Sequence, residues 1–324
     1  MTHRVSAALF GCTLLAASAA QPLPEFPQRA PTEFESTVER LDTALRDRVL
    51  VRDDARARFI SARFARADPE ALVQDLAAAV AREPRDILYL ASLASACMER
   101  TLPVRPECAA TDYLAQWSFR DGDNALPWLL LAERARRRND LATMAAHVNK
   151  AAQQPRFDDY WSRMLAAYWK ELEPLARPGE RGNAAMLARS FAASQPLIID
   201  YPILSVCATG RMAADEALRV SCGSVGKMMA QRSSSFLARL LGAGLIERAM
   251  SASAKAGVAR DTDAPLRQLQ TRCDDTEVSR GLASADPRER ALATELAVAV
   301  VVDAIATDET TACERQLARL LRTK

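Results

Sequence analysis

One short stretch has the residue types of a phosphate-binding loop or of a nucleophilic serine. Residues 222–227 read Cys-Gly-Ser-Val-Gly-Lys. A phosphate-binding loop needs a further Gly where Ser221 stands, and a Ser or Thr where Met228 stands. A nucleophile elbow needs a Gly in place of Cys222. A helix interior packed closely against a neighbouring helix explains these small residues equally well, and we assign no catalytic residue here.

The other candidate acids and bases are few. His147 lies on an expected helix over residues 140–153, away from the apolar face of that helix, and we interpret it as a solvated or capping histidine. The acidic pairs at 158–159 and 274–275 lie at expected helix ends, where solvation accounts for them. The chain has no Cys-x-x-Cys spacing and only two histidines, so we predict no metal site and no cofactor.

The cysteines indicate disulfide chemistry. One of the seven, Cys12, lies in a segment that we expect to be removed, which leaves an even number. An even number in an exported chain favours disulfide bonds, and six cysteines allow 15 connectivities. We favour local pairs, because the members of each pair lie on successive or nearby helices: Cys97–Cys108, Cys207–Cys222 and Cys273–Cys313. The alternative is that some are buried free thiols.

The first 20 residues have the pattern of a signal peptide. Basic residues precede an apolar stretch over 5–17, and small residues at 17–20 suit cleavage after Ala19 or Ala20. The apolar stretch is too short to span a bilayer, so we predict no transmembrane span. Residues 21–31 contain four prolines and should form an extended leader.

These features predict a periplasmic or secreted protein. A lipoprotein anchored through Cys12 is the less favoured alternative, because Phe10 is bulky where that motif needs a small residue.

Composition predicts an all-α fold. Hydrophobic residues make up 49% of the 324, which is enough to bury a core, whereas aromatic residues reach only 6% and β-branched runs are nearly absent. The 43 basic and 41 acidic residues almost cancel, so we predict no nucleic-acid partner.

The helices follow from apolar periodicity and from capping residues. Thr32 with Glu35 forms a capping-box pattern, and Asp68 and Asp286 each precede a proline suited to a first helical turn. Residues 173–182 contain two prolines and two glycines and should link an array over 32–172 to a C-terminal helical domain over 183–324. Helices are expected over residues 32–50, 53–67, 69–82, 85–99, 107–118, 124–138, 140–153, 158–172, 183–194, 215–231, 233–253, 262–280, 287–306 and 309–322.

The central part of the first array has two amphipathic helices joined by a short turn. Its pattern is carried by Trp128, Leu131, Ala132 and Ala135 on the first helix, by the turn Asn139-Asp140-Leu141, and by Met144, Val148, Ala151 and Pro155 on or after the second. This unit, residues 124–157, resembles a tetratricopeptide repeat. Met144 departs from the small residue of the family, and Pro155 comes one residue early. Degenerate copies are expected over 68–171.

The resemblance implies a fold, which is a tetratricopeptide-like α-solenoid of antiparallel helix pairs followed by a second helical region. It also implies that Trp128 is buried between the two helices of its unit. The alternative is a generic array of antiparallel helices, because Ala- and Leu-rich amphipathic helices often produce this spacing.

The resemblance further implies a binding groove, because the first helices of such repeats line a concave surface. Mapping the units onto that surface places Arg136, Arg137, Trp169 and Lys170 on it, as a patch for a peptide carboxylate or an acidic segment. The alternative is a solvated face with Trp169 packed against the next helix. We therefore expect an exported, non-catalytic interaction or scaffold protein of the cell envelope with a protein or peptide partner. The alternative is a helical envelope enzyme, for example one acting on the cell wall, without a recognisable motif.

Overall fold

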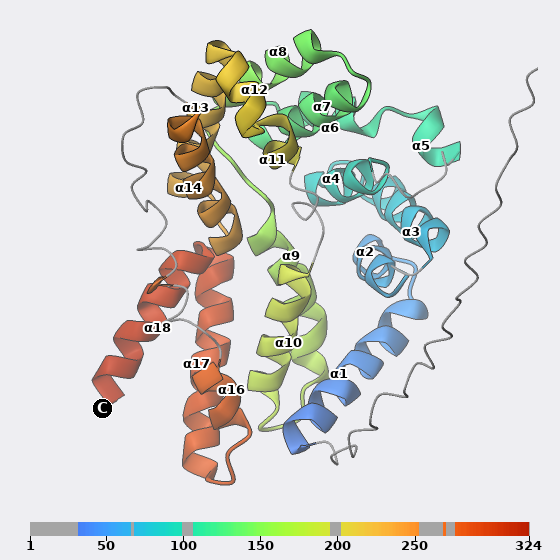
Figure 1. Cartoon of the computed structure of the whole chain (residues 1–324). Coiled ribbons are helices and arrows are strands. Elements are labelled where there is room, and N and C mark those ends of the chain that lie inside the picture. The colour runs from blue at the N-terminus through green and yellow to red at the C-terminus, as the bar shows by residue number, and fades with distance from the viewer. Residues whose placement is uncertain are drawn as a thin grey trace, which may run out of the picture. The chain divides into compact units, whose positions relative to one another are not determined.

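The fold is all-α, as predicted. The structure is a computed structural model that describes residues 32–65, 68–98, 106–194, 202–252, 268–269 and 276–323 (Figure 1). Within these ranges no segment forms a strand, and the only β-type pairing is an isolated bridge between Asn124 and Arg156. Residues 32–324 form one compact unit.

The helices of this unit are α1 (Glu33–Leu50), α2 (Ala55–Phe64), α3 (Pro69–Arg82), α4 (Ile87–Ala96), α5 (Pro106–Ala110), α6 (Tyr113–Arg120), α7 (Ala125–Arg137), α8 (Leu141–Ala152), α9 (Trp161–Leu172), the 3-10 helix η1 (Glu173–Leu175), α10 (Arg181–Ala193), α11 (Pro202–Val206), α12 (Thr209–Ala214), α13 (Glu216–Arg232), α14 (Phe236–Ser251), α16 (Thr276–Leu282), α17 (Pro287–Ala306) and α18 (Glu309–Thr323). Of these helices, none has both the length and the apolar character needed to cross a membrane.

Side-chain caps determine where several helices begin. The backbone N–H of Glu35 donates to Thr32 Oγ1 at 3.2 Å, and the N–H of Thr32 donates to the Glu35 carboxylate, so the capping box is confirmed. Asp68 and Asp286 accept backbone N–H groups at the starts of α3 and α17, each followed by proline. Because these caps satisfy donors that a helix leaves unpaired, α3 and α17 have the predicted bounds.

Other elements differ from the prediction for local reasons. The helix expected over 107–118 is divided into α5 and α6, because Asp112 caps a new helix by accepting the N–H of Ala115 at 3.0 Å. The helix expected from residue 158 begins at Trp161, because Tyr160 adopts a left-handed conformation with φ of 58°. The short helices α11 and α12 were not predicted.

The hydrophobic core is shared by helices from the whole of the unit. The pairs α2–α3, α7–α8 and α13–α14 pack closely, and α9 packs on α10, which packs on α17. The predicted linker, residues 173–182, therefore joins two helices that pack against each other, and one continuous core includes residues from both sides of it. The helix pair α7–α8 confirms a helical hairpin at 124–157, whereas regular stacking into a solenoid stays a prediction.

The Gly- and Ser-containing stretch at 222–227 lies inside helix α13, packed against α14. A Cβ added at Gly226 would lie 2.9 Å from the carbonyl oxygen of Gly242, and one added at Gly242 would lie 2.5 Å from the backbone nitrogen of Ala230. The small residues therefore permit a close crossing of two helices, as we interpreted them.

Two of the three predicted disulfides are confirmed. Cys97 is bonded to Cys108, and Cys207 to Cys222. The predicted pair Cys273–Cys313 involves Cys273, which lies outside the described residues, as do the expected signal peptide 1–20 and the leader 21–31.

Replacing Cys207 and Cys222 together by alanine should lower the free energy of unfolding by about 2–4 kcal/mol, because the bond restricts the unfolded chain. The two cysteines are 15 residues apart in the sequence and are fully buried. Urea unfolding of the parent and the double variant measures the difference, with the Cys97→Ala, Cys108→Ala pair as a second disulfide deletion for comparison. A Cys207, Cys222 variant as stable as the parent would contradict this prediction.

Candidate functional site

The two arginines predicted to bind a ligand, Arg136 and Arg137, both donate to an internal carboxylate, that of Glu133. On the last turn of α7, Arg136 donates to both oxygens of Glu133 at 2.6 and 2.7 Å, and Arg137 donates to Glu133 Oε1 at 2.8 Å. The hydroxyl of Ser205 on α11 donates to Glu133 Oε2 at 2.6 Å. Burial alone would raise the pKa of Glu133, but Arg136, Ser205 and Arg137 outweigh it and lower the pKa to about 2.

The other two predicted residues lie on α9. Trp169 is buried, with 8% of its surface exposed, whereas Lys170 is exposed. On α7, Leu126 and Leu129 are also buried, and α11 packs against α7. The described residues show no hydrogen bond or ion pair between Arg136 or Arg137 and this part of α9. A shared role of the four residues in binding stays a prediction.

Two expectations for the α7–α8 pair need correction. Trp128 is only half-buried: its indole N–H donates to the carbonyl of Gly122 at 3.0 Å, and Lys150 of α8 lies over its ring. His147 is only partly solvated: it is half-buried against Trp128, with ring centroids 6.0 Å apart. Burial lowers the pKa of His147, the charge of Arg134 lowers it further, and Asp140 opposes both.

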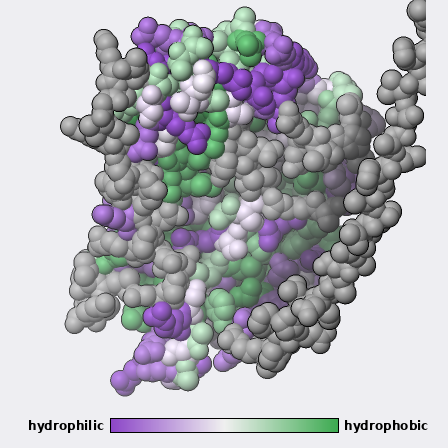
Figure 2. Space-filling view, in the orientation of Figure 1, coloured by the Kyte–Doolittle hydropathy of each residue, from purple (hydrophilic) through white to green (hydrophobic). Residues whose placement is uncertain are grey.

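An open pocket lies at the end of α7, on a different face from Glu133. It has a volume of about 360 Å³ and is lined by residues from the end of α4, from α5 and α6, and from α7. Arg134 and Arg138 both line it, because residues four apart share one face of a helix. Figure 2 shows hydrophilic side chains gathered over the end of α7 and the turn into α8.

The pocket has a surplus of positive charge. Arg134 Nη1 donates to Asp112 Oδ1 at 2.7 Å. Burial would raise the pKa of Asp112, but Arg134, the N–H of Ala115 and the charge of Arg138 together lower it, so Asp112 is ionised. Arg138 itself is exposed, and no described residue makes a hydrogen bond or an ion pair with its side chain. Two guanidinium groups thus face the pocket beside one carboxylate.

A disulfide fixes one wall of the pocket. Cys97 follows α4 directly, Cys108 lies on the short helix α5, and both line the pocket. A helix as short as α5 is unstable by itself, so the covalent bond to α4 and the packing of α5 against α3 help to hold it in place. One wall of the pocket is therefore fixed covalently.

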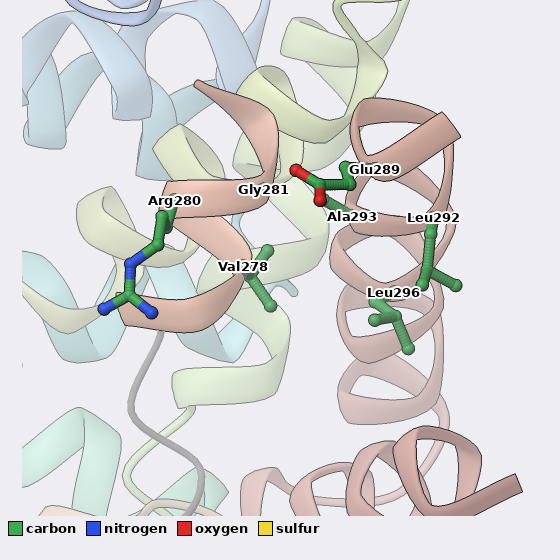
Figure 3. Close-up of a pocket in the computed structure, with 7 residues that line it drawn as sticks. All are labelled: Val278, Arg280, Gly281, Glu289, Leu292, Ala293 and Leu296. Atoms are coloured by element: carbon green, nitrogen blue, oxygen red, sulfur yellow. The ribbon is translucent and has the colours of Figure 1, made fainter. Parts of the chain in front are cut away.

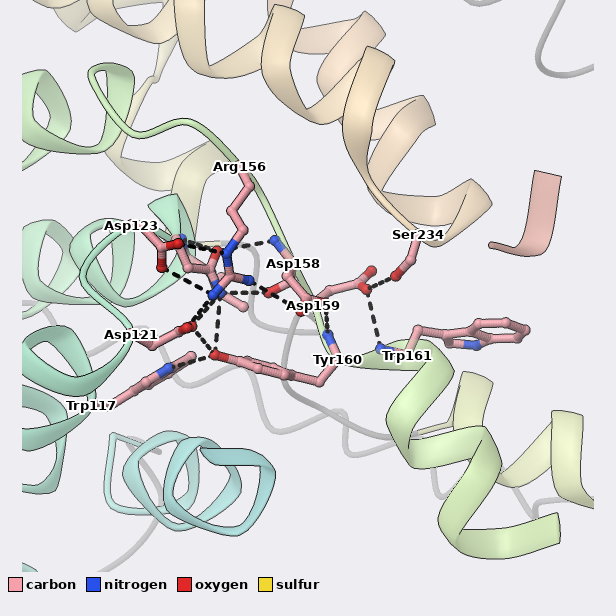
Figure 4. Close-up of polar contacts among 11 residues, drawn as sticks. Trp117, Asp121, Asp123, Arg156, Asp158, Asp159, Tyr160, Trp161 and Ser234 are labelled. Carbon is pink, nitrogen blue, oxygen red and sulfur yellow. Dashed lines mark hydrogen bonds and ion pairs between the residues drawn. The ribbon is translucent and has the colours of Figure 1, made fainter. Parts of the chain in front are cut away.

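A second polar cluster ties the segment before α9 to the α6–α7 turn (Figure 4). Arg156 forms ion pairs with Asp121, with Asp123 at 3.1 Å and with Asp158 at 3.2 Å. The hydroxyl of Tyr160 donates to Asp121 and accepts the indole N–H of Trp117 at 2.8 Å. Because these groups satisfy one another, we interpret the cluster as structural.

Asp159 differs from its neighbours, and our interpretation of it as a solvated residue at a helix end is wrong. It is fully buried and, in Figure 4, turns towards Ser234. The hydroxyls of Ser234 and Ser235 donate to its carboxyl group, with Ser234 at 2.8 Å, and so does the backbone N–H of Trp161 at 3.2 Å. Burial raises the pKa of Asp159 against the effect of these three donors. Asp159 therefore joins the start of α9 to the turn between α13 and α14.

A further pocket of about 240 Å³ lies between α16 and α17 (Figure 3). Val278, Leu292 and Leu296 line it with apolar surface. Glu289 accepts the hydroxyl of Ser284 at 2.5 Å, and Arg280 points away from Glu289 in the figure. Because its polar groups do not converge, this pocket is a weaker candidate than the one at the end of α7.

Over the ranges that the structure describes, no three His, Cys, Asp or Glu side chains are placed to hold a metal ion. No protein-family model, no curated protein and no solved structure matches the chain. The protein is thus classed by its all-α fold, and the candidate site is identified from its geometry alone.

The spacing of the arginines on α7 is a sequence signal for the pocket. Arg134 and Arg138 are four residues apart, as are Glu133 and Arg137, so the arginine run divides between two faces of one helix. Periodicity alone shows this division. It does not show which face is covered.

Proposed function

We propose that this chain is an exported, non-catalytic binding protein that takes an acidic or C-terminal peptide segment in the pocket at the end of α7. The observation that carries the proposal is Arg138, an exposed guanidinium beside a pocket that has one wall fixed by a disulfide. Arg134 provides a second positive charge there, and Asp112 cancels only one of the two.

The chemistry of the pocket suits a carboxylate. A guanidinium can donate two parallel hydrogen bonds to the two oxygens of one carboxylate, which gives both affinity and direction. The volume of about 360 Å³ is within the size range of ligand sites. Because the disulfide already fixes one wall, binding would order few further groups.

Arg136 and Arg137 support this site without contacting the ligand. They donate to Glu133, which also accepts the hydroxyl of Ser205 and so connects α7 to α11. On α9, Trp169 is buried and Lys170 is exposed, and a role for these two residues in binding stays a prediction.

Export is supported by chemistry as well as by the expected signal peptide. Disulfides persist in oxidising compartments, which favours the periplasm or the outside of the cell. The alternative of an envelope enzyme has no observation in its favour among the described residues.

Arg138→Gln should weaken peptide binding by about 10- to 100-fold, the effect of losing hydrogen bonds to a charged group. The measurement is binding to an array of acidic peptides with free C termini, beside a matching array with amidated termini. Thermal stability should not change, because Arg138 is exposed. We choose Arg138 because loss of Arg136 or Arg137 would leave the buried Glu133 short of partners.

Arg85→Gln is the matched control, since Arg85 is also exposed but lies in the turn between α3 and α4. It should bind as the parent does. Equal binding by the parent and Arg138→Gln would reject the pocket as the peptide site.

A further inference from the structure

The two disulfides that the structure describes differ in their access to solvent. Cys207 and Cys222 are fully buried in the hydrophobic core. Cys97 and Cys108 are only half-buried, and both line the open pocket at the end of α7. A thiolate reduces a disulfide by attacking one of its sulfur atoms, so the rate depends on access to that sulfur. Of the two bonds, Cys97–Cys108 is therefore the one that an external thiol can reach.

Helix α5 depends on this bond for its position. It has five residues, and none of them is buried. Ala109 and Ala110 are exposed, and Figure 1 shows α5 at the edge of the unit. Apart from the disulfide, α5 packs against α3. Because so short a helix with so little buried surface is unstable by itself, breaking the disulfide releases α5 from the end of α4.

Release of α5 would change the pocket on one side only. Cys108 and Ala109 of α5 both line it, so this part of the wall would be lost. Arg134 and Arg138 lie on α7, which packs against α8 and does not carry the bond. The reduced protein would thus keep both guanidinium groups but present them to open solvent. Ion pairs in open solvent are weak, so an acidic peptide would bind poorly there.

We infer that Cys97–Cys108 is a thiol-exchange site, and that its reduction by a dithiol switches off the pocket at the end of α7. A thiolate of the dithiol attacks one sulfur and forms a mixed disulfide, while the S–S bond breaks and the other cysteine leaves as a thiolate and takes up a proton. The second thiol of the dithiol then attacks the mixed disulfide and frees the first cysteine. Two electrons and two protons pass to the protein, and the dithiol becomes a disulfide.

The first test is reduction of the native protein by dithiothreitol, followed by alkylation and mass spectrometry of its peptides. Cys97 and Cys108 should be alkylated at least about tenfold faster than Cys207 and Cys222, because a buried disulfide reacts only when the protein opens. The buried bond is thus an internal control in the same molecule. Equal rates at the two bonds, or faster reduction of the buried bond, would overturn the inference.

The release of α5 is measured by cleavage after Glu107 with a glutamate-specific protease. Glu107 lies in α5, and cleavage there should become faster on reduction, because a protease needs a locally unfolded chain. Glu289 is the matched control, since it is exposed but lies on α17. Cleavage after Glu289 should not change. If reduction leaves cleavage after Glu107 unchanged as well, α5 does not depend on the bond and the inference fails.

Peptide binding measures the switch itself, and this part rests on the proposed function. Dithiothreitol should weaken binding of an acidic peptide to the parent by at least about tenfold, because the guanidinium groups lose the wall beside them. Cys97→Ala with Cys108→Ala should bind as weakly as the reduced parent, and dithiothreitol should not change its binding. Thermal unfolding should show that this variant is folded.

The two proposals fail in different ways. An oxidised parent that binds no acidic peptide rejects the proposed function, while alkylation and proteolysis still decide whether Cys97–Cys108 is a thiol-exchange site that holds α5. An oxidised parent that binds peptide, and binds it equally well after reduction, supports the proposed function and rejects the switch.

Discussion

Replacing Asp159 by alanine should lower the free energy of unfolding by about 2–4 kcal/mol, because buried donors would lose their acceptor. The hydroxyl of Ser235 and the N–H of Trp161 donate to this carboxyl group in the protein interior. The hydroxyl of Ser234, which is half-buried, donates to it as well. Urea unfolding at neutral pH measures the loss. Ser194→Ala, which removes a half-buried hydroxyl elsewhere, is a comparison for the general effect of a lost polar group.

Asp159→Asn tests the protonation of this group. Since burial raises the pKa of Asp159 in the folded state, the folded protein retains a proton that the unfolded chain releases near pH 3.9, the ordinary value. The stability from that proton is fully present below about pH 3.9 and is lost as the pH rises through the raised folded pKa. Asparagine has no such proton to lose.

As the pH rises above about 4, the parent should therefore lose unfolding free energy relative to Asp159→Asn. Unfolding in urea over a pH series measures this difference. A difference that does not change with pH would show that burial does not perturb Asp159.

Trp117→Ala should cost about 3–5 kcal/mol of unfolding free energy, the range for a large buried aromatic residue. Trp117 is fully buried, packs on Tyr160 with ring centroids 5.9 Å apart, and donates its indole N–H to the Tyr160 hydroxyl. Its loss would leave a cavity and remove one of the partners of Tyr160.

Trp128→Ala is the control for this substitution, and should cost only about 1–2 kcal/mol, because a half-buried side chain loses less contact area. Chemical denaturation of the two variants beside the parent measures both values. If Trp128→Ala proves as costly as Trp117→Ala, the assignment of Trp117 as the buried anchor is wrong.

The sequence by itself determined the features that depend on neighbouring residues. The all-α class follows from composition and periodicity, and the caps at Thr32, Asp68 and Asp286 determine where helices begin. The disulfides Cys97–Cys108 and Cys207–Cys222 join residues 11 and 15 positions apart, so local reasoning found them. These interactions are made within a few turns of chain, and their geometry is the same in any fold.

Only the tertiary structure decided which polar groups are buried and which arginines are free. Asp159 accepts a hydrogen bond from Ser235, 76 residues away, and Glu133 accepts one from Ser205, 72 residues away. Glu171 meets Arg48 across 123 residues of sequence. For the same reason, periodicity placed Trp128 on the inner face of its helix, while Trp117 is the residue that other elements enclose. Burial depends on what the rest of the chain places over a residue, and no local pattern contains that information.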